Sequence, residues 1–253
     1  MRNMAAGITS VFPDMDFKSP PAVDAGAILK QIEKCGVNTI TASPPFIDRL
    51  AARLSGERRK IPIRRILSGG APVRNDQLKS WREGFEDSEI LVVYGSTEAE
   101  PVAHISLEEK IGAVSSLRPR SPGFCAGKPA SLLKAKIIRI MKDELPQEAL
   151  SWNGCELGKG EIGELVVSGD HVCRDYFNNP QAVRENKIID ADGVLWHRMG
   201  DTGYFDDSGR FWLTGRVHST IFRNGLPVHP QLVEQAAKGD DARIGMAAAI
   251  GIP

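Results

Sequence analysis

Tyr94-Gly95-Ser96-Thr97-Glu98-Ala99-Glu100-Pro101 is the stretch around which the rest of the sequence is interpreted. It follows the apolar run Ile-Leu-Val-Val at residues 90–93, which is typical of a buried strand. A strand that ends in a glycine, two hydroxyl residues and a carboxylate offers backbone N–H groups, hydroxyl donors and a metal-binding acid. Such a loop can hold a nucleotide phosphate beside Mg²⁺. Thr97 with Glu100 also fits a helix capping box, which needs no ligand, and the stretch alone leaves both interpretations open.

The composition indicates a globular protein with no bulk electrostatic preference for nucleic acid or a membrane surface. The 253 residues carry 32 Lys plus Arg and 32 Asp plus Glu, so the formal net charge is zero. Apolar residues make up 42% of the chain, which is enough for a substantial core. No segment approaches the roughly 20 apolar residues of a membrane span, and the first residues do not resemble a signal peptide.

The cysteines and histidines do not follow the spacing of metal ligands. Four cysteines are far apart with no Cys-x-x-Cys pair, and the five histidines are also scattered. We therefore expect reduced thiols, neither a disulfide framework nor a zinc site, and a cytoplasmic protein.

Residues 25–93 alternate between helix and strand patterns. Helices are expected from Ala25 to a stop at Gly36, from Pro44 over Leu54, and with Leu78, Trp81 and Phe85 facing inward. Strands are expected at residues 37–41, 64–67 and 89–93. This alternation predicts parallel pairing, so the loops 68–72 and 95–98 should open at the same carboxyl edge of the sheet. Ligands bind at that edge in α/β sheets.

After about residue 115 helical periodicity gives way to short β-prone runs. Strands are predicted at 133–140 and 163–168, followed by a hairpin whose turn is residues 206–209. A small hairpin at 220–228, a helix at 230–237 and a strand at 246–250 are expected beyond Arg216.

The fold class is therefore α/β, in three parts. A partial parallel α/β sheet subdomain is expected at 1–115, a β-barrel-like subdomain at 116–214 and a truncated α+β C-terminal domain at 215–253.

Five motifs in order resemble those of the adenylate-forming, or AMP-binding, superfamily. These motifs are Ser68-Gly69-Gly70-Ala71-Pro72, Tyr94-Gly95-Ser96-Thr97-Glu98, Gly163-Glu164-Leu165 with Tyr176, Gly200-Asp201-Thr202-Gly203, and Thr214-Gly215-Arg216. The resemblance covers nearly all of residues 7–253 and is closest to fatty-acyl-CoA ligases and the β-lactone synthetases of olefin pathways.

The resemblance implies a two-step reaction. A carboxylate attacks the α-phosphate of ATP, which expels pyrophosphate and gives an acyl-adenylate. A thiol such as coenzyme A, or an internal nucleophile, then takes the acyl group. The implied ligands are ATP or AMP, Mg²⁺ and a fatty acid or other carboxylate.

The resemblance also implies roles for individual residues. Tyr94 would stack on adenine, Asp201 would accept from the ribose hydroxyls, and Arg216 would face the ribose or phosphates. Thr97 and Glu98 would be catalytic, with Thr97 donating to the α-phosphate and Glu98 holding Mg²⁺. The full set implied to bind the nucleotide is Gly70, Ala71, Pro72, Tyr94, Gly95, Ser96, Thr97, Asp201 and Arg216.

Taken singly, each residue also fits a role without a ligand. Tyr94 fits the closure of a strand end, Asp201 a turn cap, and Arg216 a solvated charge. These separate roles do not predict the shared order of the motifs.

Two of the family's cationic elements have no counterpart in the sequence. Residues 1–93 contain no Ser/Thr/Gly-rich loop with a lysine to hold the β- and γ-phosphates, and the C-terminal catalytic lysine is absent. Cationic charge stabilises the transition state of phosphoryl chemistry, so we expect little or no adenylation by this chain alone.

Two hypotheses follow from that departure. The first is an acyl-adenylate-forming ligase of which the chain is a portion. The alternative is a non-catalytic nucleotide- or acyl-binding remnant that acts as an interaction or regulatory module. A missing lobe would also expose apolar surface and favour self-association.

Overall fold

The computed structural model describes residues 5–57, 60–115, 122–141, 151–238 and 244–252. The chain divides into two compact units. The first consists of Met1–Val93 with Ser106–Gly112, and the second of Tyr94–Ile105 with Ala113–Pro253. The three-part division expected from the sequence stays a prediction, and its boundary at residue 116 lies outside the described residues.

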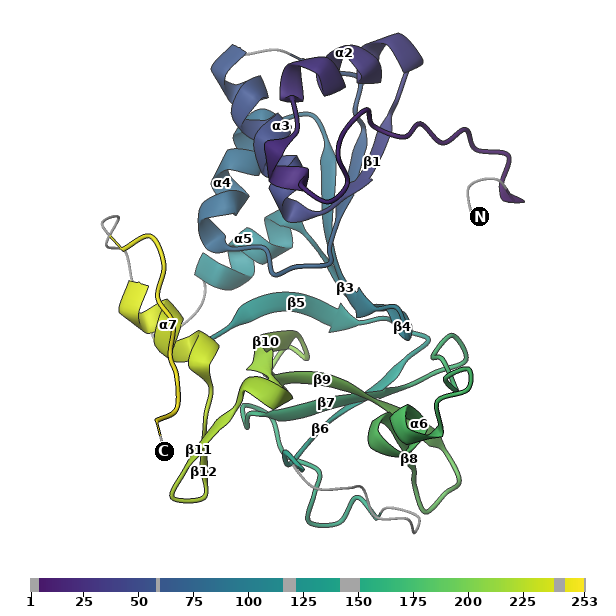
Figure 1. Cartoon of the computed structure of the whole chain (residues 1–253), viewed down its shortest axis with the longest axis vertical. Coiled ribbons are helices and arrows are strands. Elements are labelled where there is room, and N and C mark those ends of the chain that lie inside the picture. The colour runs from purple at the N-terminus through teal and green to yellow at the C-terminus, as the bar shows by residue number, and fades with distance from the viewer. Residues whose placement is uncertain (1–4, 58–59, 116–121, 142–150, 239–243, 253) are drawn as a thin grey trace. The chain divides into compact units, whose positions relative to one another are not determined.

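The first unit combines helices with a parallel sheet (Figure 1). Its strands β1, β2 and β3 pair in that order, and both pairings are parallel. The elements that begin in this unit are η1 (Pro20–Ala22), α2 (Ala25–Cys35), β1 (Thr39–Ala42), α3 (Pro44–Glu57), β2 (Arg65–Ser68), α4 (Asn75–Gly84), β3 (Glu89–Ser96) and α5 (Leu107–Ser115).

The hydrophobic periodicity explains the helices of the first unit. The apolar face of α2 is buried at Ile28, Leu29 and Ile32, and the helix ends at Gly36 as predicted. In α3 and α4 the buried apolar side chains are accompanied by two polar contacts to Asp48: Trp81 Nε1 donates to Oδ1 at 2.6 Å and Gln77 Nε2 to Oδ2 at 2.7 Å. Burial of the Trp81 indole therefore leaves its N–H satisfied.

The register of the parallel sheet positions the first glycine-bearing loop. Ser68 at the end of β2 pairs with Val92 of β3, and a Cβ atom on Gly69 would lie 2.5 Å from the Val93 carbonyl oxygen, so the loop that follows Ser68 begins beside Val93. Residues 70–72 of this loop are exposed and lead toward α4.

The second unit is built on an antiparallel sheet (Figure 1). The strand order is β4-β5-β10-β9-β7-β6, and β8 pairs with β9. A separate hairpin joins β11 to β12. The elements of this unit are β4 (Ala99–Ser106), β5 (Phe124–Pro129), β6 (Lys134–Ile138), β7 (Gly163–Ser168), α6 (Pro180–Asn186), β8 (Lys187–Ile189), β9 (Leu195–Phe205), β10 (Phe211–Arg216), η2 (Val217–Ser219), β11 (Ile221–Arg223), β12 (Leu226–Val228) and α7 (Pro230–Lys238).

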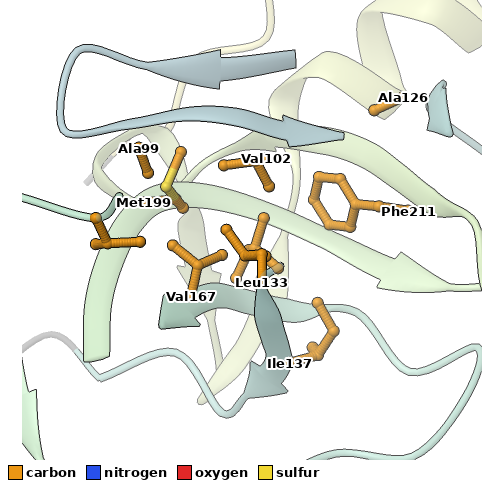
Figure 2. Packing of buried hydrophobic residues seen from close by; sticks show 10 residues of the cluster. Ala99, Val102, Ala126, Leu133, Ile137, Val167, Met199 and Phe211 are labelled. Carbon is orange, nitrogen blue, oxygen red and sulfur yellow. The ribbon is translucent and has the colours of Figure 1, made fainter. Parts of the chain in front are cut away.

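A hydrophobic cluster fills one side of this sheet (Figure 2). Side chains from six strands meet in it, and each of its members is buried. Val102 of β4, Val167 of β7, Met199 of β9 and Phe211 of β10 converge in Figure 2. The cluster therefore fixes the strands that carry the downstream motifs against β4, which begins at Ala99 within the stretch Tyr94–Pro101.

The α/β fold class is confirmed, with a parallel sheet followed by an antiparallel one. The helix capping box at Thr97 is wrong, because residues 99–106 form strand β4. The strand expected at 246–250 is also wrong: these residues are irregular and pair with no strand of the described chain, and Met246 and Ile250 are exposed. No helix was expected in the β-rich region at 116–214, but the short helix α6 lies there.

The four cysteines are free, as expected. None of the helices within the described ranges is long and apolar enough to cross a membrane.

Candidate functional site

The stretch quoted first forms a tight reversal of the chain. Strand β3 ends at Ser96. Thr97 and Glu98 form the turn, and β4 begins at Ala99. A Cβ atom on Gly95 would lie 2.7 Å from the Ala99 carbonyl oxygen, closer than real Cβ contacts come. Glycine is therefore required where the two strands fold against each other.

Tyr94, Asp201 and Arg216 form one hydrogen-bonded cluster. The Tyr94 hydroxyl donates to Asp201 Oδ2 at 2.6 Å, and an Arg216 guanidinium nitrogen (Nη1) donates to Asp201 Oδ1 at 2.6 Å. The Asp201 side chain is 9% exposed and that of Arg216 is 57% exposed. Each carboxylate oxygen retains a further lone pair, and most donors of Arg216 are unused within the cluster. The arrangement can therefore accept ribose hydroxyls and offer a cation to a phosphate.

Two shifts in strand register bring Asp201 to this position. The pairing of β10 with β9 shifts after Leu213, and beyond the shift Arg216 faces Asp201. The pairing of β7 with β9 shifts after Glu164. Gly200, which immediately precedes the carboxylate, has φ 67°, a conformation that favours glycine. Such irregularities redirect side chains in a sheet, and here they lie directly beside the proposed ribose ligand.

A buried ion pair supports the same part of β9. Arg198 donates to Glu164 through Nε at 2.9 Å and through Nη2 at 2.7 Å, with side chains 11% and 1% exposed. Burial raises the pKa of Glu164, and the bonds from Arg198 and the Gly200 amide offset part of that effect. The nearby charge of Asp201 acts in the same direction as burial. Arg198 therefore neutralises Glu164, whose charge would otherwise repel that of Asp201.

Tyr94 is held at its ring as well as at its hydroxyl. Its ring centroid lies 5.4 Å from that of Phe211, at an interplanar angle of 36°. Burial raises the pKa of Tyr94 well above its usual value, and the Asp201 charge and hydrogen bond add to the shift. The phenol therefore stays protonated and remains a donor to Asp201.

Glu98 is a partly exposed carboxylate on the turn. Tyr176 donates its hydroxyl to Glu98 Oε1 at 3.3 Å. Burial acts to raise the pKa of Glu98, but hydrogen bonds from its own backbone amide, from Ser96 and from Tyr176 outweigh it and lower the pKa. The carboxylate is therefore ionised at neutral pH and retains capacity for another ligand.

The donor set at Glu98 fits Mg²⁺ bound together with a phosphate. Within the described ranges, no three or more His, Cys, Asp or Glu residues gather into a group that could hold a metal ion. Mg²⁺ is typically held by one or two carboxylates plus phosphate oxygens and water, so a single carboxylate such as Glu98 is sufficient.

Lys187 and His197 lie behind the Glu98 turn and were not among the residues singled out from the sequence. They face each other in the pairing of β8 with β9, and both are buried. Burial lowers the pKa of Lys187. Burial, followed by the charge of Lys187, lowers the pKa of His197 to about 4. Tyr176 carried a sequence signal as part of a motif, but Lys187 carried none, because its place depends on the pairing of distant strands.

The structure brings together some of the predicted site residues. Tyr94, Asp201 and Arg216 are in direct contact, while Gly95, Ser96, Thr97 and Glu98 continue the chain from Tyr94, with Thr97 exposed. Gly70, Ala71 and Pro72 belong to the first unit, and their role beside adenine stays a prediction.

Comparisons with known proteins agree with the motifs. A family profile described as "AMP-binding enzyme" matches residues 2–177. An olefin β-lactone synthetase from Stenotrophomonas maltophilia is 34% identical over 237 residues, which cover 91% of this chain and 41% of that protein. An acyl-CoA ligase from Aspergillus fumigatus is 31% identical over 196 residues, which cover 76% of this chain and 29% of the ligase.

Solved structures share the fold. The o-succinylbenzoate coenzyme A synthetase of Bacillus subtilis, in complex with ATP and magnesium ion, matches with a TM-score of 0.68 and 26% identity. The match covers 91% of this chain and 42% of the synthetase. The chain thus spans about two fifths of the length of the olefin β-lactone synthetase and of the o-succinylbenzoate coenzyme A synthetase.

Proposed function

The chain belongs to the AMP-binding enzyme family, and from this premise we propose that it forms the ribose- and magnesium-binding part of an acyl-adenylate-forming ligase. The observation that carries the proposal is the contact of Asp201 with both Tyr94 and Arg216. These residues come from three separate motifs and meet around one carboxylate. Separate structural roles for each residue would not require them to meet.

In the proposed reaction, a carboxylate oxygen of the acid attacks the α-phosphorus of ATP. An oxygen–phosphorus bond forms, the bond between the α- and β-phosphates breaks, and pyrophosphate leaves. The acyl-adenylate then transfers its acyl group to coenzyme A or to a hydroxyl of the acyl chain itself, and AMP leaves. The relatives named as an acyl-CoA ligase and an olefin β-lactone synthetase support these two acceptors. A fatty acid as the carboxylate substrate follows the resemblance of the motifs to fatty-acyl-CoA ligases.

The residues of the chain divide this work. Asp201 accepts hydrogen bonds from the ribose, and Tyr94 and Arg216 keep its two oxygens in place. Thr97 donates to the α-phosphate, and Glu98 provides the carboxylate ligand of the metal. A bound Mg²⁺ neutralises negative charge on the phosphate oxygens.

Nucleotide binding tests this assignment directly. AMP, or an acyl-sulfamoyl adenosine, should raise the melting temperature of the chain, and Asp201→Ala should abolish the shift. Asp207→Ala is a matched control, because Asp207 is an exposed carboxylate in the nearby 206–209 turn. Asp201→Asn, which preserves side-chain volume, guards against simple misfolding. A shift that survives both Asp201 substitutions would show that the ribose assignment is wrong.

A second candidate is a binding module without catalysis, which is favoured by the absence of a lysine-bearing phosphate loop in residues 1–93. A site that retains both acyl and nucleotide positions should bind the acyl-sulfamoyl adenosine more tightly than AMP. A nucleotide-only module should bind the two equally.

The 253-residue chain itself should show no ATP–pyrophosphate exchange with fatty acids. Robust exchange would contradict the importance assigned here to the missing cationic loop.

A further inference from the structure

The irregular segment at residues 169–179 contacts Glu98 at two points. The Cys173 amide donates to the Glu98 backbone carbonyl at 2.7 Å, and the Tyr176 hydroxyl donates to Glu98 Oε1 at 3.3 Å. One segment therefore holds both the main chain and the carboxylate of the proposed metal ligand. A loop without regular secondary structure needs its own anchor if it is to fix another residue.

Lys187 provides that anchor. Its ammonium donates to the Cys173 carbonyl, and it lies 5.2 Å from the centroid of the Tyr176 ring. Lys187 is only 8% exposed, and its backbone pairs with β9 through His197. The ammonium thus joins both contact points of the segment to the sheet, since Cys173 and Tyr176 are the two residues that reach Glu98.

The surroundings of Lys187 distinguish it from an ordinary ion-pairing lysine. Across the described chain, no carboxylate lies within 4.0 Å of its ammonium. Its partners are a carbonyl oxygen and an aromatic face, which hold a desolvated cation by dipole and quadrupole. Neither partner of Lys187 occupies the ionised carboxylate of Glu98, which therefore stays available to another cation. Direct pairing of Lys187 with Glu98 would instead compete with a metal.

We propose that Lys187 is a positioning residue for Glu98, acting through Cys173 and Tyr176 to hold the carboxylate in the orientation that receives a divalent cation. The inference rests on the proposed function, in which Glu98 is the ligand of Mg²⁺. Lys187 itself touches neither the metal nor the nucleotide.

The chain offers a matched control for this contact. Lys136 in β6 also lies over aromatic rings, 5.2 Å from the Trp152 centroid and 5.7 Å from that of Trp196. Its carboxylate partner is Glu156, at 2.5 Å. Lys136→Met therefore removes a lysine–aromatic contact of similar geometry that does not lead to Glu98.

Metal binding is measured on the 253-residue chain with Mn²⁺ as the probe. Free Mn²⁺ is followed by electron paramagnetic resonance in the presence of AMP, because ATP itself chelates Mn²⁺ in solution, and AMP binding without metal is measured separately by calorimetry. Lys187→Met and Tyr176→Phe should each weaken Mn²⁺ binding about three- to tenfold and leave metal-free AMP binding unchanged. Lys187→Arg should retain Mn²⁺ affinity within about twofold, because it keeps the charge and the stacking on Tyr176. Lys136→Met should have no effect on either measurement.

A second readout does not depend on any ligand. Hydrogen exchange of the Cys173 amide, which is bonded to the Glu98 carbonyl, should become several-fold faster in Lys187→Met and remain unchanged in Lys136→Met. Unchanged exchange together with unchanged Mn²⁺ affinity in Lys187→Met would overturn the inference. Faster exchange with unchanged Mn²⁺ affinity would reject the positioning role and leave a structural anchor only.

The wild-type protein separates this inference from the proposed function. If wild type binds AMP but shows no Mn²⁺ binding in its presence, the metal role of Glu98 fails, and the positioning role of Lys187 fails with it. If wild type binds Mn²⁺ and Glu98→Gln abolishes that binding while Lys187→Met does not weaken it, only the role of Lys187 fails.

Discussion

Asp201 and Glu98 are two carboxylates of the second unit that the structure holds in opposite ways. Asp201 is buried and receives short hydrogen bonds on both oxygens, from Tyr94 and Arg216. Glu98 lies on a turn, is partly exposed, and receives hydrogen bonds from its own backbone amide, from Ser96 and, at 3.3 Å, from Tyr176. The difference indicates that Asp201 is fixed before any ligand arrives, whereas Glu98 retains capacity for a further partner.

This contrast matches the chemistry proposed for each residue. Ribose recognition requires acceptors in a fixed geometry, because the hydroxyl groups of a ribose have a fixed spacing. A Mg²⁺ ligand must instead offer an oxygen that can exchange a hydrogen bond within the protein for the metal. A carboxylate that is fully bonded within the protein would be poorly suited to that exchange.

The largest expected effect comes from breaking the buried ion pair of Arg198 with Glu164, which supports the strand that carries Asp201. Glu164→Ala leaves Arg198 buried without its bidentate partner, and we expect a loss of about 3–5 kcal/mol in the free energy of unfolding. Urea denaturation measures the loss. Lys60→Ala, which removes an exposed pair with Asp87, should leave the denaturation midpoint unchanged. A loss below about 1 kcal/mol for Glu164→Ala would mean that this side of the site is not rigidly supported.

Substitution of Asp201 itself should have the next largest effect. Asp201→Asn removes the charge opposite Arg216 but can still accept from Tyr94, so we expect about 2 kcal/mol of destabilisation. Tyr94→Phe removes only the hydroxyl and should cost less than Asp201→Asn. Denaturation of both variants at pH 7 checks the order, and equal or reversed costs would contradict the assigned contacts.

His197, which lies near Glu98, should make the free energy of unfolding depend on pH. The folded pKa of His197 is about 4 and its ordinary value is 6.5, so the unfolded state binds the extra proton first as the pH falls. His197 therefore makes no difference to stability above pH 6.5, and it lowers stability progressively between pH 6.5 and 4. At pH 5 the loss should be about 1–2 kcal/mol.

His197→Asn supplies the comparison for that pH dependence. Subtracting the variant's unfolding free energies from those of wild type cancels the carboxylates that titrate in the same range. A difference that does not change between pH 7 and 5 would show that His197 is not held neutral by burial.

The smallest effect on stability is expected for Glu98→Gln. The carboxylate is partly exposed, its bond to Tyr176 is long, and the amide oxygen of a glutamine can still accept from the residue's own N–H and from Ser96, so the free energy of unfolding should change by no more than about 0.5 kcal/mol. Urea denaturation beside Asp201→Asn provides the direct comparison. A cost equal to that of Asp201→Asn would remove the proposed distinction between a fixed and an available carboxylate.

Local pattern was sufficient to predict much of the fold. The helix from Ala25 to Gly36 and the strand β7 at Gly163–Ser168 were predicted at their observed places, because each has a clear apolar period and a turn residue at its end. Strand β4 was missed. Its sequence includes Pro101, which lacks a backbone donor and is uncommon within sheets. The strand predicted at 246–250 had apolar residues but gained no pairing partner in the described chain.

Site residues could be predicted from the sequence only where they belong to a recognisable motif. Asp201 and Arg216 could be named from their motifs, but the register shift that makes them face each other could not. Lys187 and Tyr176 are eleven positions apart in a region without periodicity, and their contact depends on the irregular segment between β7 and α6. Such contacts are set by strand pairing across the unit, which a single sequence does not display.

The indole of Trp81, buried in the first unit with its N–H on Asp48, also makes that unit separately visible. The other three tryptophans, Trp152, Trp196 and Trp212, all lie in the second unit. The tryptophan fluorescence of each unit can therefore be measured separately by substitution of the tryptophans in the other unit. A chain that retains Trp81 as its sole tryptophan would report the melting of the first unit, and Trp81→Phe would report the second. Coincidence of the two curves would show that the units unfold as one cooperative body.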